Sequence, residues 1–423
     1  MRLLYTLLFY AATPLVLARL FWRGRREPAY RLRWRERLGR YSATPPSENT
    51  LWFHAVSVGE AEAAFPLIRA LARRFPDHPI LVTTTTPTGS ARVRAVLGDS
   101  VSHVYLPYDL PDAVARFLAH FRPRLAVVLE TEIWPNLCRA CGARGIPLAI
   151  VNARLSERSA KGYAKLGGFT RDTLGNVRLI AAQTEADAGR FRAVGARGES
   201  VVVTGNIKFD MELPAGYLNQ AAELRRSLFA DRPVWVAAST HDGEEAQVLQ
   251  AFAALRQRRP SLLLVLAPRH PPRFDGVAAL CRAAGFAVRR RSLGESATEA
   301  GAEVFLLDTL GELRLFYAAS DLAFVGGSLV PVGGHNVLEP ALAGVPVLFG
   351  PHMLNFAEAG RRLREAGGAL QVADGAELAR RVGELLDDPA RRGQMGERGK
   401  AFVDAGRGAL RRVEDALAGL LAG

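Results

Sequence analysis

Cysteine is scarce in this sequence. Only Cys138, Cys141 and Cys281 occur in 423 residues, too few and too unevenly placed for the disulfide framework of a small secreted protein. Cys138 and Cys141 have the spacing of a metal or redox pair, but the sequence has no second pair to complete a metal site. We therefore expect a protein of the reducing cytoplasm, with these two cysteines as small packed residues of a helix.

The sequence also lacks a fixed-period repeat, a low-complexity segment and an Asp-x-Asp pair at the end of a predicted strand. Without such a pair, no metal-bound sugar-nucleotide site is predicted, and we expect neither a metal nor a cofactor.

Disorder is excluded by composition, because 49% of the residues are hydrophobic and 23% are charged. A chain of this length exceeds one ordinary core, so two domains are expected.

Basic residues exceed acidic ones, with a formal net charge of +13. Such an excess predicts an anionic partner, which can be nucleic acid, a membrane surface or an acidic substrate. Nine arginines and two glutamates lie between Arg19 and Arg40, a net +7 of the +13. This cluster adjoins an apolar run, which favours a membrane surface as the anionic partner. The rest of the chain has no basic surface interleaved with aromatics, so a membrane-tethered nucleic-acid-binding protein is the weaker interpretation.

The apolar run extends from Leu3 to Trp22. At about 1.5 Å per residue it nearly crosses a ~30 Å hydrocarbon layer, although Pro14 and Arg19 weaken it. The arginines that follow place the remaining chain in the cytoplasm, and no small-residue cleavage site is present, so a retained single-pass anchor is predicted. A buried N-terminal helix is the alternative. Residues 30–40 are expected to form a basic helix on anionic lipid, or a solvated helix face.

Past residue 50, short β-branched runs alternate with amphipathic stretches, which predicts parallel sheets with crossover helices. The expected strands are residues 51–56, 80–85, 101–106, 125–130, 147–151, 179–183 and 201–205, then 233–239, 262–268, 303–308, 322–327 and 345–350. We predict an α/β fold of two doubly wound Rossmann-like domains facing a cleft. The expected segments are 1–22 (membrane anchor), 23–45 (basic juxtamembrane segment), 46–212 and 213–400 (the two domains) and 401–423 (a C-terminal helix).

Carboxylates follow two of the predicted strands in the first domain. The motif HAVSVGE places Ser57, Gly59 and Glu60 at a strand-to-helix turn, where Glu60 can serve as a general base or simply cap the helix. In LETEIWPN, Glu130 ends a strand and Glu132 follows it, and the capping interpretation suits Glu132 better. Because neighbouring carboxylates raise one pKa, this arrangement favours a base that works near neutral pH.

Cationic and glycine-rich motifs suggest where a phosphate binds. Lys208 in TGNIKFD follows the last strand of the first domain and can stabilise a departing phosphate. Arg269 and His270 end one strand of the second domain, and Leu310, Gly311 and Glu312 follow another. The glycines let a phosphate approach the backbone closely in the segment VGGSLVPVGGHNVLEPALAGVPVLFG (325–350). The helix that begins at about Asn336 can donate unpaired backbone amides to that phosphate, and Glu339 can accept hydrogen bonds from ribose hydroxyls.

Many short motifs in a single order resemble the bacterial transferases of Kdo (3-deoxy-D-manno-octulosonic acid). They are HAVSVGE, TTTTPTGS, LPYDLP, ETEIWPN, VNARLSERS, GNIKFD, ASTHDGEE, APRH, DTLGEL and GGSLVPVGGHNVLEP. The resemblance extends from the apolar run nearly to the C-terminus, with minor variation at Val337.

The resemblance implies a GT-B glycosyltransferase on the cytoplasmic side of the bacterial inner membrane. It would transfer Kdo with inversion from CMP-Kdo to the lipid A precursor lipid IVA, in lipopolysaccharide synthesis. Glu60 matches the family's proton acceptor, and Glu130 and Lys208 match its transition-state stabilising positions. The family's CMP contacts fall on Arg269, His270, Leu310, Gly311, Glu312, Asn336, Val337, Leu338 and Glu339. A GT-B transferase or epimerase that uses a UDP-sugar is the alternative.

Overall fold

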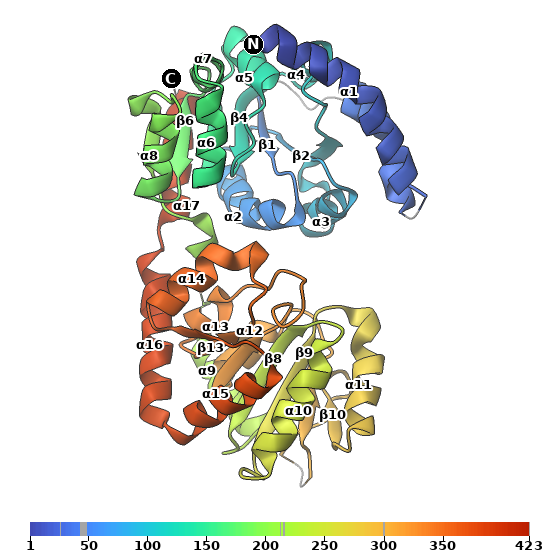
Figure 1. Cartoon of the computed structure of the whole chain (residues 1–423), viewed down its shortest axis with the longest axis vertical. Helices are drawn as coiled ribbons and strands as arrows, with labels where there is room; N and C mark the ends of the chain where they lie inside the picture. The colour runs from blue at the N-terminus through green and yellow to red at the C-terminus, as the bar shows by residue number, and fades with distance from the viewer. Residues whose placement is uncertain (26, 43–48, 212, 215, 299–300, 423) are drawn as a thin grey trace. The chain divides into compact units, whose positions relative to one another are not determined.

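The chain folds into two compact α/β units (Figure 1). The computed structural model describes residues 1–25, 27–42, 49–211, 213–214, 216–298 and 301–422. Unit 1 comprises Met1–Asp210 together with Arg407–Gly423, and unit 2 comprises Met211–Gly406. Within the described residues, each unit contains a seven-stranded sheet in which every paired strand is parallel.

The sheet of unit 1 has the strand order β3-β2-β1-β4-β5-β6-β7. Its strands are β1 (Thr50–His54), β2 (Ile80–Thr84), β3 (Ser102–Tyr105), β4 (Pro123–Leu129), β5 (Leu148–Ala153), β6 (Leu179–Ala182) and β7 (Val201–Val203). All seven coincide with predicted strands. In the register, Phe53 of β1 lies between Val82 of β2 and Val127 of β4. The chain order reverses beside β1, so the carboxyl ends of β1 and β4 lie next to each other.

Both faces of this sheet are covered, which is why its strands read as continuous apolar runs. Leu51 and Phe53 face one core and Trp52 faces the other. The first core is covered by α2 (Val58–Arg74), α3 (Pro87–Leu97) and α17 (Ala409–Ala422). The second is covered by α4 (Pro111–Phe121), α5 (Pro135–Ala143), α7 (Gly168–Leu174) and α8 (Glu185–Ala193), with α6 (Glu157–Lys165) nearby. Cys138 and Cys141 are free and buried in α5, as expected of packed helix residues.

The apolar run forms the single helix α1 (Arg2–Arg23), long and apolar enough to cross a membrane. It lies along unit 1 beside α4 and α5 (Figure 1). The Tyr5 hydroxyl donates to Asp109 Oδ2 at 2.9 Å, and the Tyr10 hydroxyl donates to Asp112 Oδ1 at 2.5 Å. Asp109 is 2% exposed and also accepts two backbone amides, so it is a fixed docking point for the helix.

The basic segment after α1 differs from the prediction of a continuous helix at 30–40. It forms two 3-10 turns, Pro28–Arg31 and Trp34–Leu38, and Arg33 between them has a left-handed φ of 51°. The guanidinium groups of Arg33 and Arg37 each lie 4.4 Å from the centre of the Tyr105 ring. The predicted continuous helix is therefore wrong here, because contacts with the rest of unit 1 hold part of this segment.

The sheet of unit 2 has the order β10-β11-β9-β8-β12-β13-β14. Its strands are β8 (Val234–Thr240), β9 (Leu263–Pro268), β10 (Val288–Arg290), β11 (Val304–Leu306), β12 (Leu322–Val325), β13 (Val347–Phe349) and β14 (Ala369–Gln371). The prediction found the five inner strands and missed β10 and β14. These two have only three residues each and lie at the edges, so they lack the long apolar run that identifies a buried strand.

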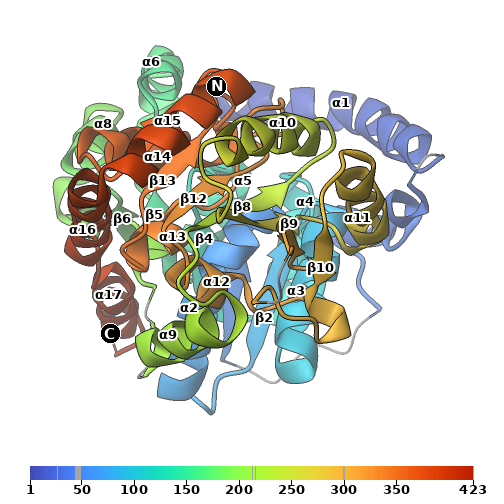
Figure 2. The same ribbon diagram turned by 90° about the horizontal axis from the view of Figure 1, so that it is seen from below.

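Helices cover both faces of this second sheet, as the view from below shows (Figure 2). One face packs on α10 (Glu244–Arg256), α11 (Phe274–Ala283) and α15 (Gly375–Asp387), and the other packs on α9 (Tyr217–Leu228) and α12 (Leu313–Ala318). The remaining helices of the unit are α13 (Leu338–Leu342), α14 (Ala357–Glu365) and α16 (Pro389–Ala405). The segment predicted as one helix at 401–423 is split at Gly406–Gly408, where Gly408 has a φ of +84°.

Candidate functional site

Glu60 lies in the first turn of α2, directly after β1. Its Oε2 accepts the Val56 amide at 2.7 Å, and its Oε1 accepts the Ser57 hydroxyl at 3.2 Å. The carboxylate therefore binds the turn that begins the helix, as the capping alternative expects. The turn remains open on one side, because a Cβ added at Gly59 would meet only Ser57 Oγ, at 4.0 Å. A capping role and a role as base are thus compatible at this position.

The environment of Glu60 raises its pKa to about 7. Burial is the largest cause, and the nearby charges of Glu130 and Glu132 add to it, while the Val56 amide opposes it. Burial also raises the pKa of Glu132. A carboxyl group with a pKa of about 7 is ionised in a large fraction of molecules at neutral pH and still binds a proton well, which suits a general base.

Glu130 and Lys208 form an ion pair, with 2.9 Å between Lys208 Nζ and Glu130 Oε1. Both side chains are only about a quarter exposed, at 28% for Lys208 and 24% for Glu130. Glu130 follows β4 in a left-handed conformation with a φ of 59°, which is uncommon for a residue other than glycine. The structure therefore brings together the three residues that the sequence singled out in the first domain: Glu130 contacts Lys208 and its charge acts on Glu60.

Three amide side chains outside the predicted set fix the turn that carries Lys208. Asn152 Oδ1 accepts the Ile207 amide at 3.1 Å. Gln183 joins the network by donating to the Asn152 carbonyl at 2.9 Å and accepting from Asn206 Nδ2 at 3.1 Å. Asn152 also has a left-handed φ of 52°. Asn152 is the penultimate residue of β5, and its place in the motif VNARLSERS, directly after the predicted strand at 147–151, was the available signal.

In unit 2, Arg269 and His270 follow β9 and are exposed. The Arg269 amide donates to the Thr240 carbonyl at 3.0 Å, which ties the end of β9 to the end of β8. His241, the next residue after β8, places its ring 5.2 Å from that of His270. His241 Nε2 also lies 2.8 Å from Nε2 of His335. The prediction included His270 but neither His241 nor His335, although both occur in the motifs that carry the resemblance.

Glu244 is a fully buried carboxylate that organises the glycine-rich segment, and it was not among the predicted site residues. Its Oε2 accepts the amides of His241 at 2.9 Å and Gly327 at 2.6 Å. Its Oε1 accepts the amides of Ser328 at 2.9 Å and Leu329 at 2.8 Å. Three of these charge-assisted hydrogen bonds hold the segment after β12 to the start of α10, and the fourth holds the turn that precedes α10. The motif ASTHDGEE contained this residue, but its burial could not be read from the sequence.

The predicted residues at 310–312 form an exposed turn. Leu310 is 73% exposed, and Gly311 has a φ of +89°, which favours glycine. The Glu312 carboxylate is bound by Arg291, at 2.6 Å for the shorter contact, and by the Thr309 hydroxyl at 2.5 Å. The Arg291 guanidinium holds the pKa of Glu312 below its usual range. This turn therefore presents a positioned backbone and an ionised carboxylate.

The predicted residues at 336–339 form the start of α13. Asn336 Oδ1 accepts the Leu338 amide at 3.1 Å. The side chains of Val337 and Leu338 are fully buried, so only their backbone can contact a ligand. Glu339 is bound by Arg314 at 3.1 Å. The predicted helix is short, with five residues, which limits the dipole that it can offer to a phosphate.

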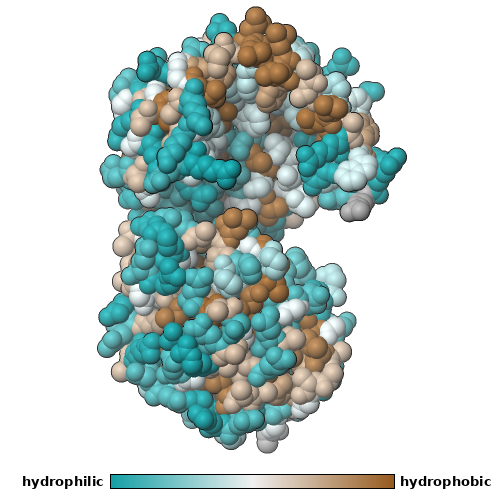
Figure 3. Space-filling model, in the orientation of Figure 1, coloured by the Kyte–Doolittle hydropathy of each residue, from teal (hydrophilic) through white to brown (hydrophobic). Residues whose placement is uncertain are grey.

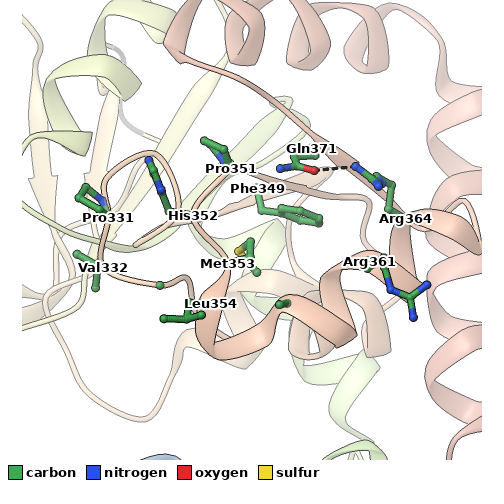
Figure 4. Close-up of a pocket in the computed structure, with 12 residues that line it drawn as sticks. Pro331, Val332, Phe349, Pro351, His352, Met353, Leu354, Arg361, Arg364 and Gln371 are labelled. Carbon is green, nitrogen blue, oxygen red and sulfur yellow. Dashed lines mark hydrogen bonds between the residues drawn. The ribbon is translucent and has the colours of Figure 1, made fainter. Parts of the chain in front are cut away.

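A cavity of about 500 Å³ lies elsewhere in unit 2, beside the start of α14 (Figure 4). Its lining includes Val332, Phe349, His352, Met353 and Arg364, and Arg364 donates to Gln371 at 2.7 Å. In the described part of the chain, none of the residues predicted to contact CMP lines this cavity. Across the described ranges, no group of three or more His, Cys, Asp or Glu side chains is arranged to hold a metal ion.

Two parallel-sheet α/β units, with polar side chains at the carboxyl ends of their strands, define the GT-B architecture of glycosyltransferases. UDP-GlcNAc 2-epimerase from Neisseria meningitidis, in its structure bound to UDP-GlcNAc, shares this fold. The two match with a TM-score of 0.56 and 16% identity, over 88% of this chain and 100% of that one. At this identity the match shows the fold alone.

The chain belongs to the family of 3-deoxy-D-manno-octulosonic-acid (Kdo) transferases, whose family model matches residues 32–211. The 3-deoxy-D-manno-octulosonic acid transferase of Haemophilus influenzae is 44% identical over 418 residues, which are 98% of each chain. The transferase of Bordetella pertussis is 40% identical over 424 residues, also 98% of each chain. The protein is therefore an enzyme, a glycosyltransferase that transfers Kdo.

Proposed function

We propose that this enzyme transfers Kdo with inversion from CMP-Kdo to the lipid A precursor lipid IVA in lipopolysaccharide synthesis. The observation that carries the general-base step of this proposal is the position of Glu60 at the start of α2, beside an open turn and near the charges of Glu130 and Glu132. Its raised pKa of about 7 suits it to accept a proton at neutral pH. The neighbouring pair of Glu130 and Lys208 matches the positions that the family resemblance assigns to the transition state. The nearly full-length similarity to Kdo transferases supports the sugar that is transferred.

The chemistry of this reaction assigns a step to each of these groups. Glu60 takes the proton of a sugar hydroxyl on the acceptor, and the oxygen attacks the anomeric carbon of Kdo through an oxocarbenium-like transition state. The bond from that carbon to the phosphate oxygen breaks, and CMP departs with the electron pair. Lys208 stabilises the negative charge that develops, and Glu130 keeps Lys208 in position. No metal or cofactor takes part in this scheme.

Mass spectrometry of the reaction product tests the proposal. With purified protein, CMP-Kdo and lipid IVA, we expect the acceptor mass to rise by whole Kdo units while CMP is released in equal amount. UDP-N-acetylglucosamine with the same acceptor is the control donor, and it is expected to yield no product. Product from the UDP-sugar, or release of CMP without any change in the mass of the lipid, would contradict the proposed donor and acceptor.

We also propose that α1 attaches the protein to the cytoplasmic face of the bacterial inner membrane. Leu4, Leu7, Leu8 and Leu15 are exposed, and at about 100° per residue they fall within one narrow arc of the helix. The groups that bind the rest of unit 1, namely Tyr5, Thr6 and Tyr10, lie outside this arc. Hydrophobic surface gathers over the beginning of α1 (Figure 3).

These contacts favour a helix that lies in the membrane surface over the spanning anchor expected from the sequence. A spanning α1 would have to give up the hydrogen bonds of Tyr5 and Tyr10, whereas a helix lying along unit 1 keeps them and still turns its leucines outward. Arginines near the end of the helix, such as Arg19 and Arg23, can then meet anionic headgroups.

Replacing Leu7 and Leu8 together with aspartate is expected to release most of the protein from lipid vesicles. The two side chains are more than half exposed, and burying charge in place of leucine removes the apolar gain that binds an interfacial helix. Flotation with anionic vesicles measures this release, and Leu293→Asp, at an exposed leucine of unit 2, is the matched control.

The Arg2→Cys variant tests whether α1 lies in the membrane surface. Its thiol should react with an impermeant maleimide in inside-out vesicles, whereas reaction only from the periplasmic side would contradict the in-plane arrangement.

A further inference from the structure

Two histidines of unit 2 that take no part in the proton transfer by Glu60 are in direct contact. Nε2 of His241 lies 2.8 Å from Nε2 of His335, and the two rings are nearly parallel, with 6° between their planes. Two ring nitrogens at this distance form a hydrogen bond only if one of them carries the proton and the other accepts it. The pair therefore shares one N–H, and each ring keeps its Nδ1 for a second partner.

The pair lies among cationic groups, and the neighbouring carboxylates are already occupied. Burial lowers the pKa of His335 to about 3, and the charge of Arg269 and the rings of His241 and His270 add to this effect. Burial also lowers the pKa of His241, on which Glu244, His270, Arg273 and Glu245 act as well. Glu244 is bound by four backbone amides and Glu245 by Arg273 at 2.5 Å. Without an anion the pair is therefore neutral, and only the charge of an arriving anion would stabilise a second proton on it.

The backbone approaches the pair closely at Gly327. A Cβ there would lie 2.9 Å from His335 Cδ2, too close for a side chain, and 3.5 Å from His241 Cδ2, in van der Waals contact. Gly327 has a φ of +66°, and its amide is held by Glu244. The pair thus lies where β8 and β12 end, at the edge of a parallel sheet where such folds bind phosphates.

We propose that His241 and His335 form the binding site for the phosphate of the nucleotide sugar and protonate that phosphate as it departs. This inference rests on the proposed function, because it assumes a donor with a phosphate bound to its sugar. The arriving anion stabilises an imidazolium, so the pair takes up one proton from solvent. When the bond between the anomeric carbon and the phosphate oxygen breaks, the oxygen keeps the electron pair and receives that proton from the pair.

Calorimetry with CMP and with cytidine tests the assignment. We expect the wild-type enzyme to take up about one proton with CMP at pH 7.5 and none with cytidine, as read from buffers of different ionisation enthalpy. His335→Gln and His241→Gln should each weaken CMP binding by about tenfold or more, because a charge-assisted hydrogen bond is lost, and should abolish the proton uptake. Their affinity for cytidine should not change. His352→Gln, at an exposed histidine of the same unit, is the matched control and should behave as wild type.

The possible results separate this inference from the proposed function. If wild-type enzyme binds CMP with proton uptake and both folded variants do the same, the pair does not bind phosphate and the inference alone is overturned. If the variants instead lose affinity for free Kdo while CMP binding is retained, the pair holds the sugar carboxylate, which also overturns it. If wild-type enzyme binds UDP but not CMP, the proposed donor itself is wrong. Thermal unfolding of each variant shows that it is folded.

Discussion

Replacing Glu60 with glutamine is expected to lower the rate of Kdo transfer by about 10²–10⁴-fold, the range in which general bases contribute. Glutamine keeps the size of the side chain and an acceptor oxygen for the Val56 amide, but it cannot take a proton from the acceptor hydroxyl. Initial rates with labelled CMP-Kdo measure the effect. Glu62→Gln, at an exposed glutamate of the same helix, is the matched control. Near-normal turnover in folded Glu60→Gln would remove the base assignment.

The pH dependence distinguishes loss of the base from a structural effect of the same substitution. Because the pKa of Glu60 is raised to about 7, the wild-type rate should fall as the pH drops below 7 and the carboxylate becomes protonated. Lys208→Ala leaves the negative charge of Glu130 without its partner, and this raises the pKa of Glu60 further. The fall in rate at acidic pH should therefore begin at a higher pH in this variant. If the fall in rate at acidic pH occurs at the same pH in Lys208→Ala as in the wild type, Lys208 does not influence the pKa of Glu60.

Replacing Glu244 with alanine is expected to lower the free energy of unfolding of unit 2 by roughly 3–5 kcal/mol, as the loss of a buried charged partner does. The substitution leaves the amides of His241, Gly327, Ser328 and Leu329 without their acceptor. For a unit of this size the midpoint of thermal unfolding should fall by roughly 10 °C, measured by circular dichroism or calorimetry. CMP binding should weaken as well, because the amides position His241 and Gly327.

Two further variants show whether the loss of stability comes from the hydrogen bonds of Glu244. Glu244→Gln keeps one acceptor oxygen and should be intermediate, because it loses the charge and places a donor where two amides bind. Glu223→Ala, at an exposed position of α9, should leave the unfolding midpoint within about 1 °C. If Glu244→Ala unfolded at the same temperature as Glu223→Ala, the amides would have another acceptor and the role assigned to Glu244 would be wrong.

The strands could be predicted because they are buried on both faces. Such a strand needs apolar residues at every position, so segments such as Leu51–Phe53 and Leu263–Leu266 appear as continuous runs. Edge strands have no such requirement, which is why β10, with Arg289 and Arg290, and β14 were not recognised. The order of the strands within each sheet also required the structure, because a run of residues does not specify its neighbours.

The basic segment after α1 shows the opposite case, in which local pattern was misleading. Residues 30–40 are rich in arginine and follow the apolar run, which led to the prediction of a basic surface helix. In the structure Glu36 is buried and accepts the Tyr105 amide at 2.8 Å, and burial raises its pKa. Contacts with residues about seventy positions away decide the conformation here, and their free energy exceeds a helix propensity of a few tenths of a kcal/mol per residue.

The sequence by itself determined which residues stand at the carboxyl ends of strands, because that depends only on where each apolar run stops. Glu60, Glu130 and Lys208 could therefore be selected from their positions along the chain alone. Only the tertiary structure decided what those residues can do: the pKa of Glu60 depends on burial and on charges from other elements, and the pair of His241 and His335 joins residues 94 positions apart. Electrostatic effects follow distance in space, and distance in space is set by the fold.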